Sequence, residues 1–260
     1  KIPDFKKLEE LGKQGVIALI VESTYADDPK KMPSEQVAKE MLRDVLIGTN
    51  NKDNLIIVTT FSSHIARLKS IIEFGQKLNR KIIFLGRSLS KYVKAAESIG
   101  IVNFSKDVEI VKYSKQIEQR LHKVDKDRKK YLLVVTGHQG EQKSVLHKIA
   151  KGDIKFKLYP EDNVIFSCRT IPTPTNIANR EALENDLKQN RVRIFKDIHQ
   201  SGHAAREDLR DFINMVKPQS IFPAHGNHKM KESLAELAEE MGYKIGKNVF
   251  LLKDGHKQRI

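Results

Sequence analysis

The feature that most constrains the fold is an alternation of short apolar runs with stretches of helical periodicity. Between residues 34 and 100 the runs Leu55–Val58 and Lys81–Leu85 are separated by amphipathic stretches. Ser34 stands where a helix N-cap is expected, and Val37, Met41, Leu42, Val45 and Leu46 follow it on one helical stripe. Alternating strands and helices predict an α/β fold, in which helical crossovers connect the strands of a parallel sheet.

The pattern continues to the end of the chain. Apolar runs predict further strands at residues 131–135, 163–168, 192–198, 220–222 and 249–252, and periodic stretches predict helices at 143–150, 177–187, 209–216 and 229–241. A first helix is expected at 5–12. The continuous apolar run Val16–Val21 indicates a strand buried on both faces, whose neighbours must come from later in the chain or from residues preceding Lys1. The Pro172–Asn176 stretch marks a crossing between domains.

The charge balance favours a polyanionic partner. Forty-seven Lys and Arg against 33 Asp and Glu give a net charge of +14, and the pI is near 9.6. Nucleic acid is the most natural partner for such a surface, and a generally lysine-rich proteome is the competing explanation. Residues 115–130 carry seven basic and three acidic residues. This run could contact a phosphate backbone, but a solvated helix and loop is the favoured interpretation.

Several classes of protein are excluded or disfavoured. No apolar run approaches the length of about 20 residues that a membrane span needs, and no apolar segment of a signal peptide follows Lys1. The lone Cys168 rules out a disulfide framework and a cysteine-built zinc site, which favours a cytoplasmic protein. There is no Walker loop, no Gly-x-Ser-x-Gly elbow, and no Gly-x-Gly-x-x-Gly fingerprint of a Rossmann-like nucleotide-binding module.

Three side chains stand out by their expected position at the carboxyl ends of strands. They are Glu22, His203 in the run Ser201-Gly202-His203-Ala204, and His225 in the run Pro223-Ala224-His225-Gly226. Open α/β sheets bind ligands at this edge, and the neighbouring glycines let backbone approach a ligand closely. A structural role in turns is the alternative for each histidine. No His-x-His-x-Asp-His cluster is present, so the motifs alone do not assemble a complete metal site.

The order of four motifs resembles that of the β-CASP ribonucleases of the metallo-β-lactamase fold, and most closely ribonuclease J of the archaeal type. The motifs are Val21–Ala26, Thr136–Glu141, Ser201–Ala204 and Pro223–Gly226, and the resemblance extends to Thr60–His64, Gly86–Ser88 and Asn248–Leu252. It implies part of a metallo-β-lactamase αββα sandwich with an inserted parallel-sheet β-CASP domain. The expected divisions are 1–33, 34–185 and 186–260, with the middle segment as the insertion.

The resemblance also implies roles for single residues. His225 matches a direct zinc ligand, His203 a histidine that contacts the scissile phosphate, and Glu22 an acidic residue that orients His203. Two zinc ions are implied, but only in the complete protein, because the other family ligands are missing here. The chain is therefore expected to be the back portion of a longer protein. It departs from the usual family pattern at His138, Gln142 and Asn227.

The function implied by the resemblance is hydrolysis of RNA phosphodiester bonds by a zinc-dependent ribonuclease. A 5′-to-3′ exonuclease acting on single-stranded RNA with a 5′-monophosphate is the first expectation. A β-CASP endonuclease and a non-catalytic β-CASP subunit that binds RNA are the alternatives, and a homodimer is possible. The residues expected to contact RNA or phosphate are Ser62, Ser63, His64, Arg67, Arg87, Ser88, Thr136, Gly137, His138, Gln139, Gly140, Glu141, Ser201, Gly202 and Ala204.

Overall fold

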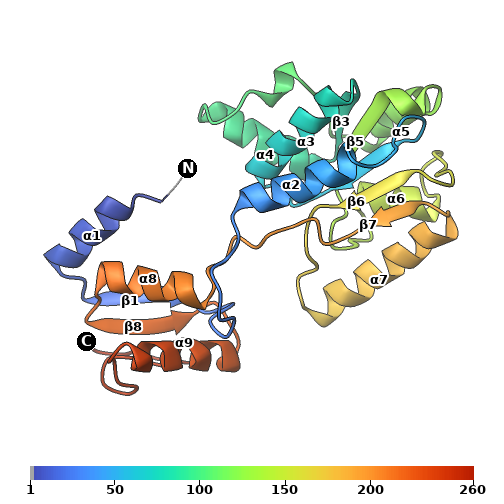
Figure 1. Cartoon of the computed structure of the whole chain (residues 1–260). Coiled ribbons are helices and arrows are strands. Elements are labelled where there is room, and N and C mark those ends of the chain that lie inside the picture. The colour runs from blue at the N-terminus through green and yellow to red at the C-terminus, as the bar shows by residue number, and fades with distance from the viewer. Residues whose placement is uncertain (1–2) are drawn as a thin grey trace. The chain divides into compact units, whose positions relative to one another are not determined.

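The computed structural model describes residues 3–260 and divides them into two units (Figure 1). The first unit combines the two ends of the chain, up to Pro33 and from Ser201 onward, and the second is the continuous stretch Ser34–Gln200. The first boundary of these compact units coincides with the expected division after residue 33. The second follows residue 200 and not 185, because the strand after residue 190 pairs within the sheet of the second unit.

The first unit is built on a parallel pair of strands from opposite ends of the chain. Strand β1 (Ala18–Glu22) pairs with β8 (Ser220–Ala224) so that Glu22 lies opposite Ala224. Its helices are α1 (Phe5–Gln14), α8 (Arg206–Val216) and α9 (His228–Glu240), and Figure 1 shows the last two beside the strands. The predicted strand at 249–252 is wrong, because only Val249 forms an isolated bridge.

Alternating burial along β1 corrects the expectation that this strand is buried on both faces. Leu19 and Val21 pack in one apolar cluster with Leu209 of α8 and Leu234 of α9. Ile20, between them, is 74% exposed. Within this chain β1 therefore has one buried and one open face, although a late strand does supply its partner, as expected.

The second unit contains a six-stranded parallel sheet in the order β4-β3-β5-β2-β6-β7. Its strands are β2 (Ile56–Thr59), β3 (Lys81–Leu85), β4 (Glu109–Val111), β5 (Tyr131–Val135), β6 (Asn163–Phe166) and β7 (Arg193–Phe195). The predicted parallel sheet is thus confirmed. The sequence did not predict β4, because only one of its three residues is buried.

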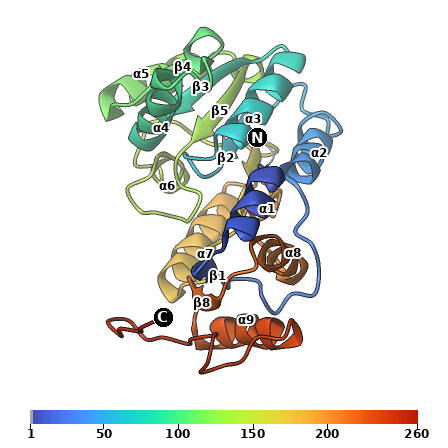
Figure 2. The same cartoon turned by 90° about the vertical axis from the view of Figure 1, so that its left-hand side faces the viewer.

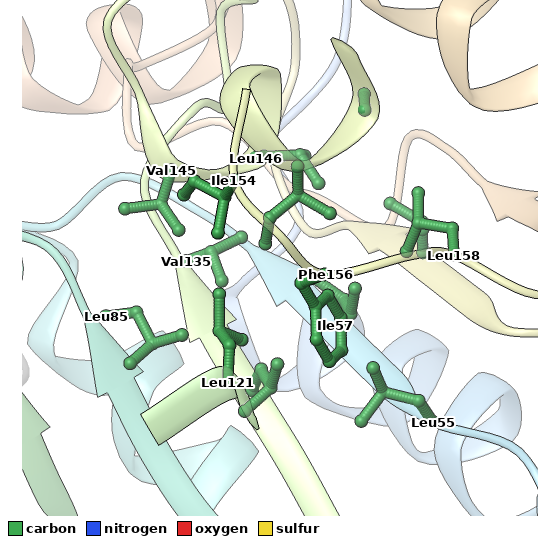
Figure 3. Close-up of a cluster of buried hydrophobic side chains, with 14 of the residues drawn as sticks. Leu55, Ile57, Leu85, Leu121, Val135, Val145, Leu146, Ile154, Phe156 and Leu158 are labelled. Atoms are coloured by element: carbon green, nitrogen blue, oxygen red, sulfur yellow. The ribbon is translucent and has the colours of Figure 1, made fainter. Parts of the chain in front are cut away.

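Helices cover both faces of this sheet. One apolar cluster joins it to α2 (Glu35–Leu46), α3 (Ile65–Lys77) and α4 (Arg87–Ser98). A second cluster joins the other face to α5 (Ser114–Asp125), α6 (Val145–Lys151) and α7 (Pro174–Gln189). Figure 2 gives a second view, and Figure 3 shows side chains of β2, β3 and β5 meeting those of α5 and α6. Helices that follow adjacent strands β3 and β5 therefore leave toward opposite faces, which creates a crevice at their carboxyl ends.

A buried arginine ties the end of the second unit to its sheet. Arg67 of α3 is fully buried. Its guanidinium donates to both carboxylate oxygens of Glu35, at 2.6 and 2.7 Å, and to the carbonyls of Ser167 and Ile198, at 3.0 and 2.8 Å. The expectation that Arg67 contacts phosphate is wrong, because these partners occupy the guanidinium and leave it no solvent-exposed surface.

Replacing Arg67 by Met should lower the free energy of unfolding by about 3 kcal/mol, because the change strands a carboxylate and two carbonyls beside an apolar side chain. Glu35 keeps a third of its side chain in contact with solvent, which limits the loss. Urea unfolding measures the effect, and Arg87→Met, at an exposed position on α4, is the matched control. Equal stability of the two variants would contradict a structural role for Arg67.

Candidate functional site

Glu22, His203 and His225 come together in the first unit, as the sequence predicted. Ligand atoms of the three residues all lie within 4.8 Å of one another, and within residues 3–260 no other group of His, Cys, Asp or Glu meets the same criterion. Glu22 ends β1 and His225 directly follows β8. His203 differs from the expectation. It lies in the loop before α8 rather than at a strand end, because β7 stops at Phe195.

Glu22 positions His203 through both of its carboxylate oxygens. Oε2 pairs with Nδ1 of the His203 ring, and Oε1 accepts from the Ala204 amide at 3.1 Å. Thr24 Oγ1 also contacts Oε2, at 3.2 Å. This arrangement fixes the ring so that Nε2 is the nitrogen open to a ligand. It also commits the Ala204 amide to Glu22, so this amide is not free to bind phosphate.

The backbone around His225 shapes the other side of the group. His225 adopts a left-handed conformation with a φ of 47°, which turns the chain sharply after β8. Ser23 Oγ donates to the Ala224 carbonyl at 2.8 Å, and a Cβ on Gly226 would lie 2.6 Å from that same Oγ. A glycine is therefore required at 226. The rings of His225 and His203 stack with their centroids 5.3 Å apart.

Of Glu22, His203 and His225, one has a side chain that is free to bind a metal. The oxygens of Glu22 are already hydrogen-bonded, whereas within the described residues the exposed His225 ring has no hydrogen-bond partner. An imidazole with an open nitrogen is a typical zinc ligand. His225 thus fits the part of a single ligand, and one ligand does not close a tetrahedral site.

A second candidate site lies at the carboxyl ends of β3, β5 and β4. A pocket of about 560 Å³ brings together Arg87, Ser88, Thr136 and Glu141 of the predicted residues. Ser62 joins this rim through a 3.0 Å hydrogen bond between its Oγ and that of Ser88. The backbone at Gly86 is tightly packed against Thr136. Gly86 has a φ of 140°, and a Cβ on it would lie 2.5 Å from the Thr136 methyl group.

Other predicted contacts at this edge serve the structure of the second unit. His64 caps α3 by accepting from the Arg67 amide at 3.2 Å, and Gln139 is buried and bridges to Arg169 and Ile171. Gly140 lies against the backbone of α7. Of the other predicted residues, Ser63 is exposed and Gly202 has open space around it. Gly137 has a φ of 128°, and Ser201 Oγ accepts from the His203 amide.

Two histidines at this edge, His138 and His199, are partly buried. Burial lowers the pKa of His138, whose ring meets Phe61 edge to face at 4.3 Å. Burial, followed by the charge of Arg67, lowers the pKa of His199 to about 4. Both rings are therefore neutral near pH 7, and the cations available for an anion here are lysines and arginines.

The sequence missed part of the pocket lining. Lys112, Lys143, Ser144 and Lys148 face the same hollow as Arg87. Lys112 follows β4, the strand that the apolar pattern did not reveal. Lys143 and Ser144 precede α6, where Ser144 is the N-cap and accepts from the His147 amide at 3.3 Å. The place of Ser144 at the start of a helix was the signal in the sequence that could have identified this part of the lining.

Comparison with known proteins identifies the family. Residues 53–185, half of the chain, match the family model described as "Ribonuclease J, beta-CASP domain". The chain belongs to the ribonuclease J family. Residues 191–251 match a second model, "Zn-dependent metallo-hydrolase RNA specificity domain", which places them in a zinc-dependent domain type. Both domain types belong to the metallo-β-lactamase fold family, which confirms the expected fold class.

Individual relatives of ribonuclease J type agree. The chain is 45% identical over 99% of its length to Ribonuclease J of Pyrococcus abyssi and 42% identical over 97% to that of Methanocaldococcus jannaschii. Ribonuclease J of Thermus thermophilus is 32% identical over 93% of the chain. The chain spans 57% of the length of either archaeal relative and 40% of the bacterial one. Among the residues described, no helix has the length and hydrophobicity to cross a bilayer.

Proposed function

We propose that this chain is part of a cytoplasmic zinc-dependent ribonuclease that hydrolyses phosphodiester bonds of single-stranded RNA. The observation that carries the proposal is the Glu22–His203–His225 group, in which Glu22 meets two histidines from the residues that match a zinc-dependent domain type. His225 would hold zinc, and two ions would be bound in the complete protein. When bound, zinc supplies Lewis acidity toward a phosphate oxygen and lowers the pKa of water.

The residues of this chain then act on the phosphate. With Nδ1 of His203 directed at Glu22, Nε2 is the ring nitrogen left to face a substrate. From this position it would hydrogen-bond to a phosphate oxygen or to the leaving oxygen. The intact pair favours a catalytic protein over a non-catalytic RNA-binding subunit. The direct test is RNA cleavage by the full-length protein before and after zinc removal, and cleavage that survives complete chelation would refute the proposal.

The pocket beside β3 and β5 supports recognition of an RNA 5′ end. Arg87 and the lysines place cations around hydroxyl groups of Ser88 and Thr136, which suits a phosphate. A monophosphate bound here would favour 5′-to-3′ exonuclease action over endonuclease action. Glu141 also faces the pocket, and its negative charge disfavours a more highly charged triphosphate.

Arg87→Ala should reduce the preference for 5′-monophosphate over 5′-triphosphate RNA, because the variant loses the arginine that faces the pocket. Initial cleavage rates on the two RNAs, measured with the full-length protein, give the preference. Lys91→Ala removes a charge one turn along α4 at an exposed position outside the pocket and is the control. Equal rates of the unmodified protein on both RNAs would eliminate the end pocket.

A further inference from the structure

Over half of the net positive charge resides on a short part of the second unit. Residues 112–157 contain thirteen basic and five acidic residues, a net charge of +8 out of +14 for the chain. Only the 115–130 portion was conspicuous in the sequence, and alone it is well explained as a solvated helix. The structure adds that α5 and α6 cover the same face of the six-stranded sheet.

The segment after α6 displays its lysines by strict alternation. Ile154, Phe156 and Leu158 are buried and point into the cluster shown in Figure 3. Lys155 and Lys157, which lie between them, are exposed. Burial of the apolar neighbours thus keeps the two lysines on the outside of the unit.

An arginine joins this segment to the end of α5. The Arg128 guanidinium lies 4.7 Å from the ring centre of Phe156 and 4.5 Å from that of Tyr159. Arg128 also pairs with Asp125 at 2.6 Å, so its own charge is compensated. Two basic runs separated in sequence are thereby held next to each other.

Several lysines among residues 112–157 are exposed and form no ion pair within the described part of the chain. We give the name lysine face to five of them: Lys123, Lys126, Lys129, Lys155 and Lys157. Unpaired charges of the same sign repel one another, and a bound polyanion removes that repulsion while releasing counterions. The pocket that contains Arg87 opens between α5 and α6, on the same side of the sheet.

We propose that the lysine face binds the backbone of single-stranded RNA through residues separate from those of the candidate cleavage site, so that long RNAs are held more tightly than short ones. The inference rests on RNA being the substrate, as proposed above. Recognition by lysine alone implies contacts to phosphate without base specificity.

The test compares two triple variants of the full-length protein. Lys126, Lys155 and Lys157 are changed to Gln in one, and Lys69, Lys91 and Lys106 in the other. The second set is also exposed and without ion pairs, and its elements pack on the opposite face of the sheet. Binding of a 3′-fluorescent 2′-O-methyl RNA of about 30 nucleotides, long enough to exceed a typical single-strand site, is measured with zinc retained. Thermal melting verifies that both variants are folded.

The lysine-face variant should bind the long RNA about tenfold to hundredfold more weakly at 0.1 M salt, with the salt slope reduced by about 2, since each lost phosphate contact contributes about 0.7. The opposite-face variant should lose much less affinity for the long RNA. The lysine-face variant should in turn lose much less affinity for a 5′-monophosphate RNA of about five nucleotides, which fits within one short site. Equal losses in the two variants would overturn the proposal, as would competition by poly-glutamate as effective as by RNA. Binding is measured without cleavage, so an inactive enzyme leaves this result interpretable.

Discussion

Replacing His225 by alanine in the full-length protein should remove bound zinc and abolish RNA cleavage. The ring is exposed, has no hydrogen-bond partner in the described residues, and stands at the turn after β8 beside His203. Loss of a direct ligand should exceed the effect of about 10- to 100-fold on metal affinity that is typical when a supporting residue is lost. Elemental analysis of the purified protein measures zinc, and RNA cleavage measures activity.

His228→Ala is the matched control for this experiment. His228 lies three residues further along the chain at the start of α9, is largely exposed and pairs with Glu232 at 3.1 Å. Its removal should leave zinc and cleavage unchanged. If His225→Ala retained its zinc and its activity, the assignment of His225 as a ligand would be wrong.

Alanine at His203 should instead slow cleavage while zinc stays bound. A group that donates a proton in the transition state typically contributes a factor of about 10²–10⁴ in rate. Glu22 holds the His203 ring through Nδ1, which leaves Nε2 to face the phosphate. Removing the ring should therefore affect the reaction at the phosphate and not the binding of zinc. Turnover and zinc content measured on the same sample separate these two roles, and loss of zinc from His203→Ala would show that the two histidines have been assigned the wrong way round.

Glu22→Gln tests the positioning role separately. The amide keeps the size of the side chain, but its single oxygen cannot take the place of both carboxylate oxygens, which hold Nδ1 of His203 and the Ala204 amide. Turnover should fall less than in His203→Ala, while the KM for RNA changes little and zinc is retained. Turnover equal to that of the unmodified protein would contradict the positioning role.

The sequence predicted the parts of the fold that depend on local patterns. Runs such as Leu55–Val58 and Tyr131–Val135 could be recognised as strands from the sequence. A strand that is covered on both faces of a sheet is apolar at nearly every position, which gives a continuous hydrophobic signal. Strand β4, at the edge, has mixed burial and therefore no such signal. The loop that carries His203 was misplaced because the strand predicted at 192–198 extends beyond the three residues that pair with β6.

The candidate site was predicted by motif and not by periodicity. Glu22 and His203 are far apart in sequence, and only the fold shows that they touch. Arg67 illustrates the opposite failure. An arginine near Thr60–His64 resembles a phosphate contact in sequence, but its guanidinium has buried acceptors from Ser167 and Ile198, which no local pattern reveals.

The pairing of β1 with β8 has a consequence for synthesis on the ribosome. The Ala204 amide that holds Glu22 is made 182 residues after it, a delay of roughly 10–40 s at typical rates of translation. Strand β1 must wait through that interval without its partner, with the apolar side chains of Leu19 and Val21 uncovered, while the continuous stretch Ser34–Gln200 emerges and can fold. A nascent chain interrupted before residue 203 contains a complete six-stranded sheet but no Glu22–His203 pair, so the group that we propose to act on RNA assembles only after the whole second unit has been made.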